Sequence, residues 1–129
     1  AFVARARRVR KMLGGGMRQA GILAAAGIVA IEKMSKRLKE DHENALLLAK
    51  GLNSLEGVSV DVGRVQTNLI MVDFAGTGLN GMQVAERLKQ NGILINGSSS
   101  PVVRFAVHYY ITPDDVKRTV EVVSKIIKN

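Results

Sequence analysis

Residues 10–28 of this 129-residue chain read RKMLGGGMRQAGILAAAGI, and this stretch sets the organisation of the first third of the sequence. Three consecutive glycines carry a large entropic cost in any regular element. They therefore separate a short basic helix over residues 2–12 from a second helix that begins near Met17, where apolar residues recur at helical spacing. Because the alanines and glycines of this second helix lie on every side of it, neighbouring backbones can approach closely. We therefore expect it to be buried, with a subunit interface as one candidate location.

Positive charge is concentrated around these glycines. The formal net charge is +8, and six cations precede the first acid, Glu32: Arg5, Arg7, Arg8, Arg10, Lys11 and Arg18. Lys11 and Arg18 flank the glycine turn, which we expect to open the second helix. The free N–H groups of a helix N-terminus favour anions, and flanking cations would add charge-assisted bonds, so phosphate is the natural ligand. A glycine hinge between solvated basic residues is the alternative, and the residue order of a P-loop is absent.

A polar helix is predicted over residues 34–52. Its apolar stripe includes His42, which we interpret as a core histidine. Three acidic side chains are expected to face water: Glu40, Asp41 and Glu43. If helix were continuous over residues 17–52, it would be roughly 54 Å long and would have to lie across another body of protein.

Beyond residue 54 the apolar pattern changes from helical to alternating or continuous, which predicts strands. Four strands are expected, over residues 58–62, 69–74, 93–95 and 102–107. A helix marked by Met82, Ala85 and Leu88 lies between the second and third strands and ends at Asn91-Gly92.

The last helix has a clear start. Thr112 is its expected N-cap, Pro113 occupies the first helical position, and the acids Asp114 and Asp115 lie in the first turn. Its predicted core face consists of Val116, Val120, Val123 and Ile127.

The order of elements predicts an α/β chain with a small α+β domain, in which N-terminal helices lead into a small, mostly antiparallel sheet covered by helices. We expect a helical segment over residues 1–54 and a small domain over residues 55–129. The absence of cysteine excludes disulfides and thiolate metal sites, no other metal-ligand spacing is present, and no apolar stretch is long enough to span a membrane. A helical pattern that starts at Phe2 without an N-cap suggests that the chain was cut or began elsewhere.

Arg104 is the second candidate for a binding residue. It lies within an apolar strand, and a planar guanidinium suits bidentate binding of a carboxylate. The alternative is an edge-strand arginine that points to water. Alternation places His108 on the same face as Arg104, so both side chains can line one cleft.

Together these segments resemble the threonine aldolases. The resemblance spans nearly the whole chain but matches only the C-terminal portion of such enzymes. Its most specific part is GGGMRQAGILAAAGI at residues 14–28. It also includes RRVRK at 7–11, EDHENA at 40–45, Thr67-Asn68, ILIN at 93–96 and PVVRFAVH at 101–108.

The resemblance implies a pyridoxal 5′-phosphate enzyme of fold type I that cleaves threonine or allo-threonine to glycine and acetaldehyde. Lys11 and Arg18 match positions that reach the cofactor phosphate of the neighbouring subunit, and Arg104 matches the residue that binds the substrate α-carboxylate. The family's Schiff-base lysine lies upstream of this segment, in a large cofactor-binding domain that is missing here. The resemblance therefore implies a cytoplasmic homo-oligomer, a dimer or tetramer. In it, the present chain supplies binding groups, and on its own it is expected to be inactive.

Two other interpretations remain. Another fold-type-I enzyme, such as a lyase or transaminase, would share Arg104 and the small domain but not the GGGMRQ segment. A small basic nucleic-acid-binding module would explain the cluster of cations, but no aromatic residues are interleaved with that cluster to stack on bases. We rank the aldolase first, and we expect neither a nucleic-acid nor a membrane partner.

Overall fold

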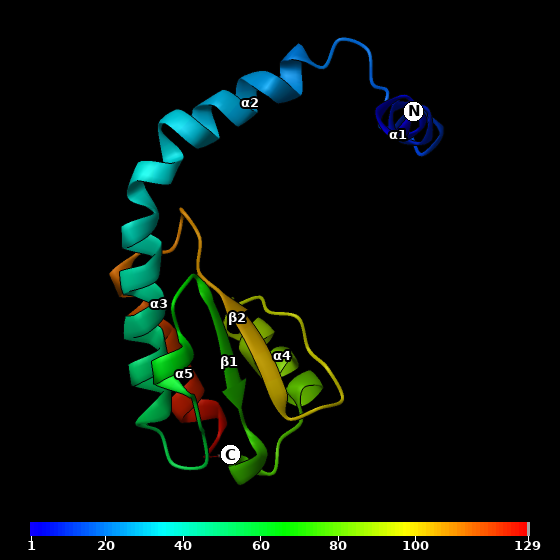
Figure 1. Ribbon diagram of the computed structural model, residues 1–129. Coiled ribbons are helices and arrows are strands. Elements are labelled where there is room, and N and C mark those ends of the chain that lie inside the picture. The colour runs from blue at the N-terminus through cyan, green and yellow to red at the C-terminus, as the bar shows by residue number, and fades with distance from the viewer. Residues whose placement is uncertain (129) are drawn as a thin grey trace. The chain divides into compact units, whose positions relative to one another are not determined.

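Two helices and a short 3-10 helix make up the first of two units in the computed structural model, which describes residues 1–128 (Figure 1). This unit covers Ala1–Arg37 and contains α1 (Phe2–Met12), α2 (Gly21–Glu32) and η1 (Met34–Arg37). The second unit begins at Leu38. Each unit has its own internal packing and is considered by itself.

The glycine triplet ends α1 rather than opening α2. Gly14 has a φ of +83°, a backbone conformation that glycine adopts without steric cost. The N–H of Gly15 donates to the carbonyl of Arg10 at 2.8 Å, and the N–H of Gly14 donates to Lys11 at 3.2 Å. This pair of bonds is the Schellman arrangement that closes many helices. Residues 18–20 then form a separate turn, so α2 starts at Gly21 and not near Met17.

Within this chain the second helix is exposed rather than buried. No residue of α2 is buried, and Ile22 and Ile31 are 77% and 75% exposed. The small residues gave α2 a surface that another backbone can approach closely, but its own unit supplies no such backbone.

Helix α3 (Leu38–Asn53) belongs to the second unit and packs against its core. It is separated from α2 by η1, so no single helix runs over residues 17–52. Its buried positions are Asp41, Ala45, Leu48, Ala49 and Leu52. This face is rotated by about one residue from the predicted stripe. His42 is therefore exposed and is not a core histidine, whereas Asp41 is only 7% exposed and does not face water.

The sheet contains two antiparallel strands, β1 (Leu69–Asp73) and β2 (Val102–Ala106), with Ile70 opposite Phe105 and Met71 opposite Arg104. Alternate residues of both strands point into a core shared with α3, α4 (Gly81–Gln90) and α5 (Pro113–Ile126). Figure 1 shows α3 beside β1 and α4 behind β2, and α5 packs against α3 and α4. The predicted fold class, mixed α and β with a small antiparallel sheet covered by helices, is confirmed.

Two of the four predicted strands do not form. Over residues 58–62, only Ser59 forms an isolated bridge, to Asp73, before the 3-10 helix η2 (Val62–Arg64). Val58 and Val60 are nevertheless buried, so the alternating apolar pattern correctly predicted which side chains face the core. Residues 93–95 are irregular, and Leu94 is 80% exposed. A second short 3-10 helix, η3 (Ala75–Thr77), follows β1.

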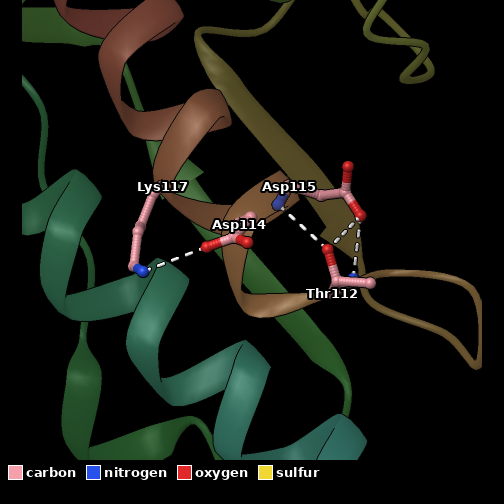
Figure 2. Close-up of polar contacts among 4 residues, drawn as sticks. All are labelled: Thr112, Asp114, Asp115 and Lys117. Atoms are coloured by element: carbon pink, nitrogen blue, oxygen red, sulfur yellow. Dashed lines mark hydrogen bonds and ion pairs between the residues drawn. The ribbon is translucent and has the colours of Figure 1, made fainter.

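Helix α5 begins as the sequence predicts. The Thr112 hydroxyl oxygen accepts from the N–H of Asp115 at 3.2 Å, and the Asp115 carboxylate accepts from the N–H and hydroxyl of Thr112 at 2.9 and 2.6 Å (Figure 2). The hydrogen bonds from the side chain and backbone of Thr112 lower the pKa of Asp115. Val116 and Val123 are buried as expected, together with Val122 and Ile126, while the predicted Val120 and Ile127 are half-buried.

The boundary between the two units falls earlier than residue 54. Since α3 packs against α5 and β1, residues 38–54 contribute to the core of the C-terminal unit. Among the described residues, no helix has both the length and the apolar character needed to cross a membrane.

Candidate functional site

Arg104 lies at the centre of β2, on the face of the sheet that the helices do not cover. Its neighbours Val103 and Phe105 are 1% and 3% exposed and point into the core, so alternation turns Arg104 and Ala106 outward. The opposite residue on β1, Met71, is also exposed. Within residues 1–128 no protein group forms a hydrogen bond or ion pair with the Arg104 side chain. Its guanidinium is therefore available to an anion.

An open cleft of about 340 Å³ borders this strand. Arg104 and His108 both line it, as their alternation along the strand predicted. The irregular segment 93–96 forms part of its wall, and Thr119 of α5 also lines it. None of its lining residues is an aspartate or glutamate. A small cleft with cationic and neutral donors and no carboxylate suits a small anionic ligand.

The far end of β2 is held by two asparagines that the sequence analysis did not single out for this role. The Asn68 side-chain amide donates to the carbonyl of Val107 at 2.7 Å, and the N–H of Val107 donates to the Asn68 carbonyl at 2.9 Å. The Asn44 amide of α3 donates to the carbonyl of Ile111 at 3.0 Å. Only tertiary contacts reveal these bonds, since their partners lie 39 and 67 residues apart.

Between these two anchors, residues 108–111 form a tight turn around His108. The N–H of Ile111 donates to the His108 carbonyl at 2.8 Å, and the N–H of Tyr110 donates to His108 Nδ1 at 3.3 Å. The rings of His108 and Tyr110 meet edge to face, with centroids 6.1 Å apart. The imidazole is thus oriented by its own turn.

Lys11 and Arg18 lie in the first unit, on either side of the glycine triplet. Lys11 is in the last turn of α1, where a cation interacts favourably with the negative end of the helix. Arg18 lies in the turn that precedes α2. The N-cap of α2 is Ala20, which provides no side-chain hydrogen bond, so the first N–H groups of the helix lack a side-chain partner. The glycine turn was predicted to open α2, but it completes α1, and the N-terminus of α2 instead follows the turn that contains Arg18.

Both donor sets are suited to binding anions. In the part of the chain that the structure describes, no group of histidine, aspartate and glutamate side chains is arranged to hold a metal ion. The donor set near Arg18, a cation beside an uncapped helix N-terminus, fits a phosphate group. The donor set around Arg104 fits a carboxylate.

Comparison with known proteins defines the class. A sequence profile of the beta-eliminating lyases matches residues 1–76, which is more than half of the chain. The chain therefore belongs to the beta-eliminating lyase family, which depends on pyridoxal 5′-phosphate. A solved structure of MppP, soaked with the product 2-ketoarginine, matches 78% of this chain and 30% of its own with a TM-score of 0.58. At 19% identity it supports the fold alone.

Within that class, several of the similar proteins are low-specificity threonine aldolases. The chain is 43% identical to low-specificity L-threonine aldolase 1 of Arabidopsis thaliana, over 92% of this chain and 33% of the relative. It is 41% identical to the low-specificity L-threonine aldolase of Escherichia coli strain K12, over 89% of this chain and 32% of the relative. The resemblance predicted from the sequence is confirmed, and the chain spans about a third of the length of these relatives.

Proposed function

We propose that this chain is the C-terminal part of a pyridoxal 5′-phosphate-dependent threonine aldolase that cleaves threonine or allo-threonine to glycine and acetaldehyde. The observation that carries the proposal is Arg104. Among the described residues it has no hydrogen-bond or ion-pair partner, it is central in β2, and it lines a cleft whose lining residues include no aspartate or glutamate. A site of this kind, in a chain 43% identical to a threonine aldolase, fits the binding of an amino-acid substrate by its carboxylate.

Arg104 orients the substrate in this proposal. A bidentate guanidinium–carboxylate pair fixes both the position and the plane of the carboxylate, which limits how the remainder of the amino acid can be presented. β2 is a suitable support because Val103 and Phe105, on either side of Arg104, are anchored in the core. The arginine therefore extends from a strand whose position the packing determines.

Lys11 and Arg18 hold the cofactor phosphate in this proposal. The uncapped N-terminus of α2 favours this role for Arg18. The position of Lys11 on the other side of the glycine triplet favours the same role for Lys11. When bound, the cofactor's pyridinium ring serves as an electron sink for the bond that is cleaved. The residues of this chain contribute binding and orientation, and the lysine that carries the cofactor belongs to a preceding domain.

The remaining partners follow from this division of labour. We propose that the complete enzyme is a cytoplasmic homo-oligomer, a dimer or tetramer, in which Lys11 and Arg18 serve the active site of a neighbouring subunit. The uncovered apolar residues of α2 support an arrangement in which that helix is covered by another part of the enzyme.

The test is the reaction of the complete product of the source gene. The purified protein, supplied with pyridoxal 5′-phosphate, is incubated with threonine or allo-threonine, and glycine and acetaldehyde are quantified together. The proposal predicts equal amounts of the two products. Release of ammonia and a keto acid in their place would indicate the lyase alternative, and cofactor-dependent exchange of amino groups would indicate a transaminase.

A further inference from the structure

We propose that His108 is a second substrate-binding residue of the Arg104 cleft, and that its Nε2–H donates a hydrogen bond to the carboxylate that Arg104 holds. The inference rests on the proposed function for the identity of the anion, an amino acid. It adds a residue whose role neither the sequence pattern nor the family resemblance assigned.

A hydrogen bond at Nδ1 fixes the tautomer of the His108 imidazole. Because Nδ1 accepts a hydrogen bond from the N–H of Tyr110 at 3.3 Å, the neutral ring carries its proton on Nε2. No described residue forms a hydrogen bond with Nε2. The turn therefore leaves one N–H donor of defined direction on an exposed ring that lines the cleft.

The turn that carries the His108 ring is anchored on both sides. Two hydrogen bonds between Asn68 and Val107 fix the chain immediately before His108. At the end of the turn, the hydrogen bond from Asn44 to the carbonyl of Ile111 fixes it again. An exposed turn with no function has little need of asparagine anchors from two different elements. Rigid support of a polar side chain is what an orienting residue requires.

The chemistry of the cleft also favours this role for His108. Arg104 and His108 lie on the same face of the chain, and the cleft they share contains donors but no carboxylate. A carboxylate has about four lone-pair positions, so a bidentate arginine leaves acceptor capacity for another donor. A histidine Nε2–H is a donor that can use it without adding a second permanent charge.

The competing explanation is that His108 only caps its own turn. Two substitutions in the complete enzyme separate these roles. His108→Asn can keep an acceptor near the position of Nδ1 for the Tyr110 N–H, but it has no group that reaches the position of Nε2. His108→Gln can place an amide N–H near the position of Nε2, but it does not reproduce the acceptor near the backbone.

The measurement is the affinity of the cofactor-loaded enzyme for glycine, followed by the change in cofactor absorbance, together with KM and kcat for threonine. We expect His108→Asn to weaken glycine binding and raise KM by about tenfold, the magnitude of one hydrogen bond to a charged group. His108→Gln should retain most of the affinity. Cofactor retention should be unchanged in both variants.

Wild-type affinity in His108→Asn, or a loss in His108→Gln that exceeds the loss in His108→Asn, would overturn the inference in favour of turn capping. Arg104→Ala is measured in parallel and tells this failure apart from failure of the proposed function. If Arg104→Ala weakens glycine binding but His108→Asn does not, only the role of His108 fails. If neither variant affects amino-acid binding, the carboxylate site itself is wrong.

Discussion

The side-chain amide of Asn68 completes the ladder between β1 and β2 by donating to the carbonyl oxygen of Val107 at 2.7 Å, while the N–H of Val107 donates to the carbonyl of Asn68 at 2.9 Å. The side chain thus supplies the donor that a backbone N–H supplies elsewhere in an antiparallel pair. Val107 is 1% exposed, so its carbonyl has little access to water as a substitute partner. This last pair of hydrogen bonds marks the point where β2 ends and the turn containing His108 begins.

Asn68→Ala is expected to destabilise the enzyme by about 1–3 kcal/mol, the cost of leaving a buried carbonyl without its partner. Urea unfolding of the complete protein measures this change. Asn91→Ala is the matched control, because that amide donates to the carbonyl of Arg87 at 2.9 Å in an exposed position. If the two variants were destabilised equally, the hydrogen bond to the buried carbonyl of Val107 would contribute no more to stability than an exposed one.

Gly57 is a position where the backbone excludes a side chain. Its φ is +79°, and an added Cβ would lie 2.9 Å from the carbonyl carbon of Gly76. We expect Gly57→Ala to cost roughly 1–3 kcal/mol through backbone strain, with more from the contact. Gly63→Ala serves as the control, since the nearest atom to its Cβ, Oδ1 of Asp61, is 3.5 Å away. Similar melting temperatures for the two variants would contradict this account.

Thr112→Ala removes the capping box of α5 and should lower stability by about 1 kcal/mol near neutral pH. The hydrogen bonds from Thr112 lower the pKa of Asp115, so the stability linked to this carboxylate is present above the ordinary aspartate pKa of about 3.9. It is lost as the pH falls through the lowered pKa of the folded state. The difference between wild type and Thr112→Ala should therefore shrink as the pH is lowered through this range, as measured by denaturant titration at several pH values.

Asp114→Asn provides the control for that prediction. Asp114 accepts from Lys117 at 3.0 Å (Figure 2). Both side chains are largely exposed. An exposed pair of this kind contributes little to stability. A loss in Asp114→Asn as large as that in Thr112→Ala would mean that charge in the first turn, and not the capping box, stabilises α5.

Arg104→Ala should raise KM for threonine by roughly 10- to 100-fold, because it removes charge-assisted bonds to the carboxylate. Arg104→Lys keeps the charge but loses the bidentate geometry and should recover only part of the affinity. Steady-state kinetics with saturating cofactor provide the measurement. An unchanged KM accompanied by loss of cofactor would assign Arg104 to the cofactor instead.

Arg18→Ala should weaken retention of pyridoxal 5′-phosphate by roughly tenfold while leaving the affinity of the loaded enzyme for glycine near that of the wild type. Equilibrium dialysis against cofactor measures this loss. Arg8→Ala removes an equal charge from the exposed surface of α1 and is the control. An equal effect of both variants would indicate a general electrostatic attraction rather than a phosphate site at Arg18.

Local signals in the sequence predicted the elements whose structure depends on neighbouring residues. Thr112, Pro113 and Asp115 specify the start of α5 through contacts within one helical turn, and alternation around Arg104 correctly predicted β2. The glycine triplet predicts a break between two helices, and the structure contains that break. The glycines end α1 rather than begin α2 because the N–H of Gly15 donates to the carbonyl of Arg10 at 2.8 Å. Composition does not specify this detail of backbone geometry.

The remaining differences arise from tertiary packing. Residues 58–62 and 93–95 have strand-like composition, but a strand also requires a partner, and only Ser59 finds one. The burial of Asp41 in place of His42 depends on which face of α3 meets α5 and β1. The Asn68–Val107 clasp joins residues 39 apart and has no local signature. The sequence could therefore indicate Arg104 and its cleft, but not the groups that support them.

The central claim is that this chain supplies binding groups to a cofactor whose lysine lies elsewhere in a longer enzyme. The most direct test is to reduce the cofactor-loaded product of the complete source gene with borohydride, digest it, and locate the labelled lysine by mass spectrometry. The account predicts one labelled lysine per subunit, in a peptide outside these 129 residues. A label on Lys33, Lys36, Lys39 or any other lysine of this chain would contradict it.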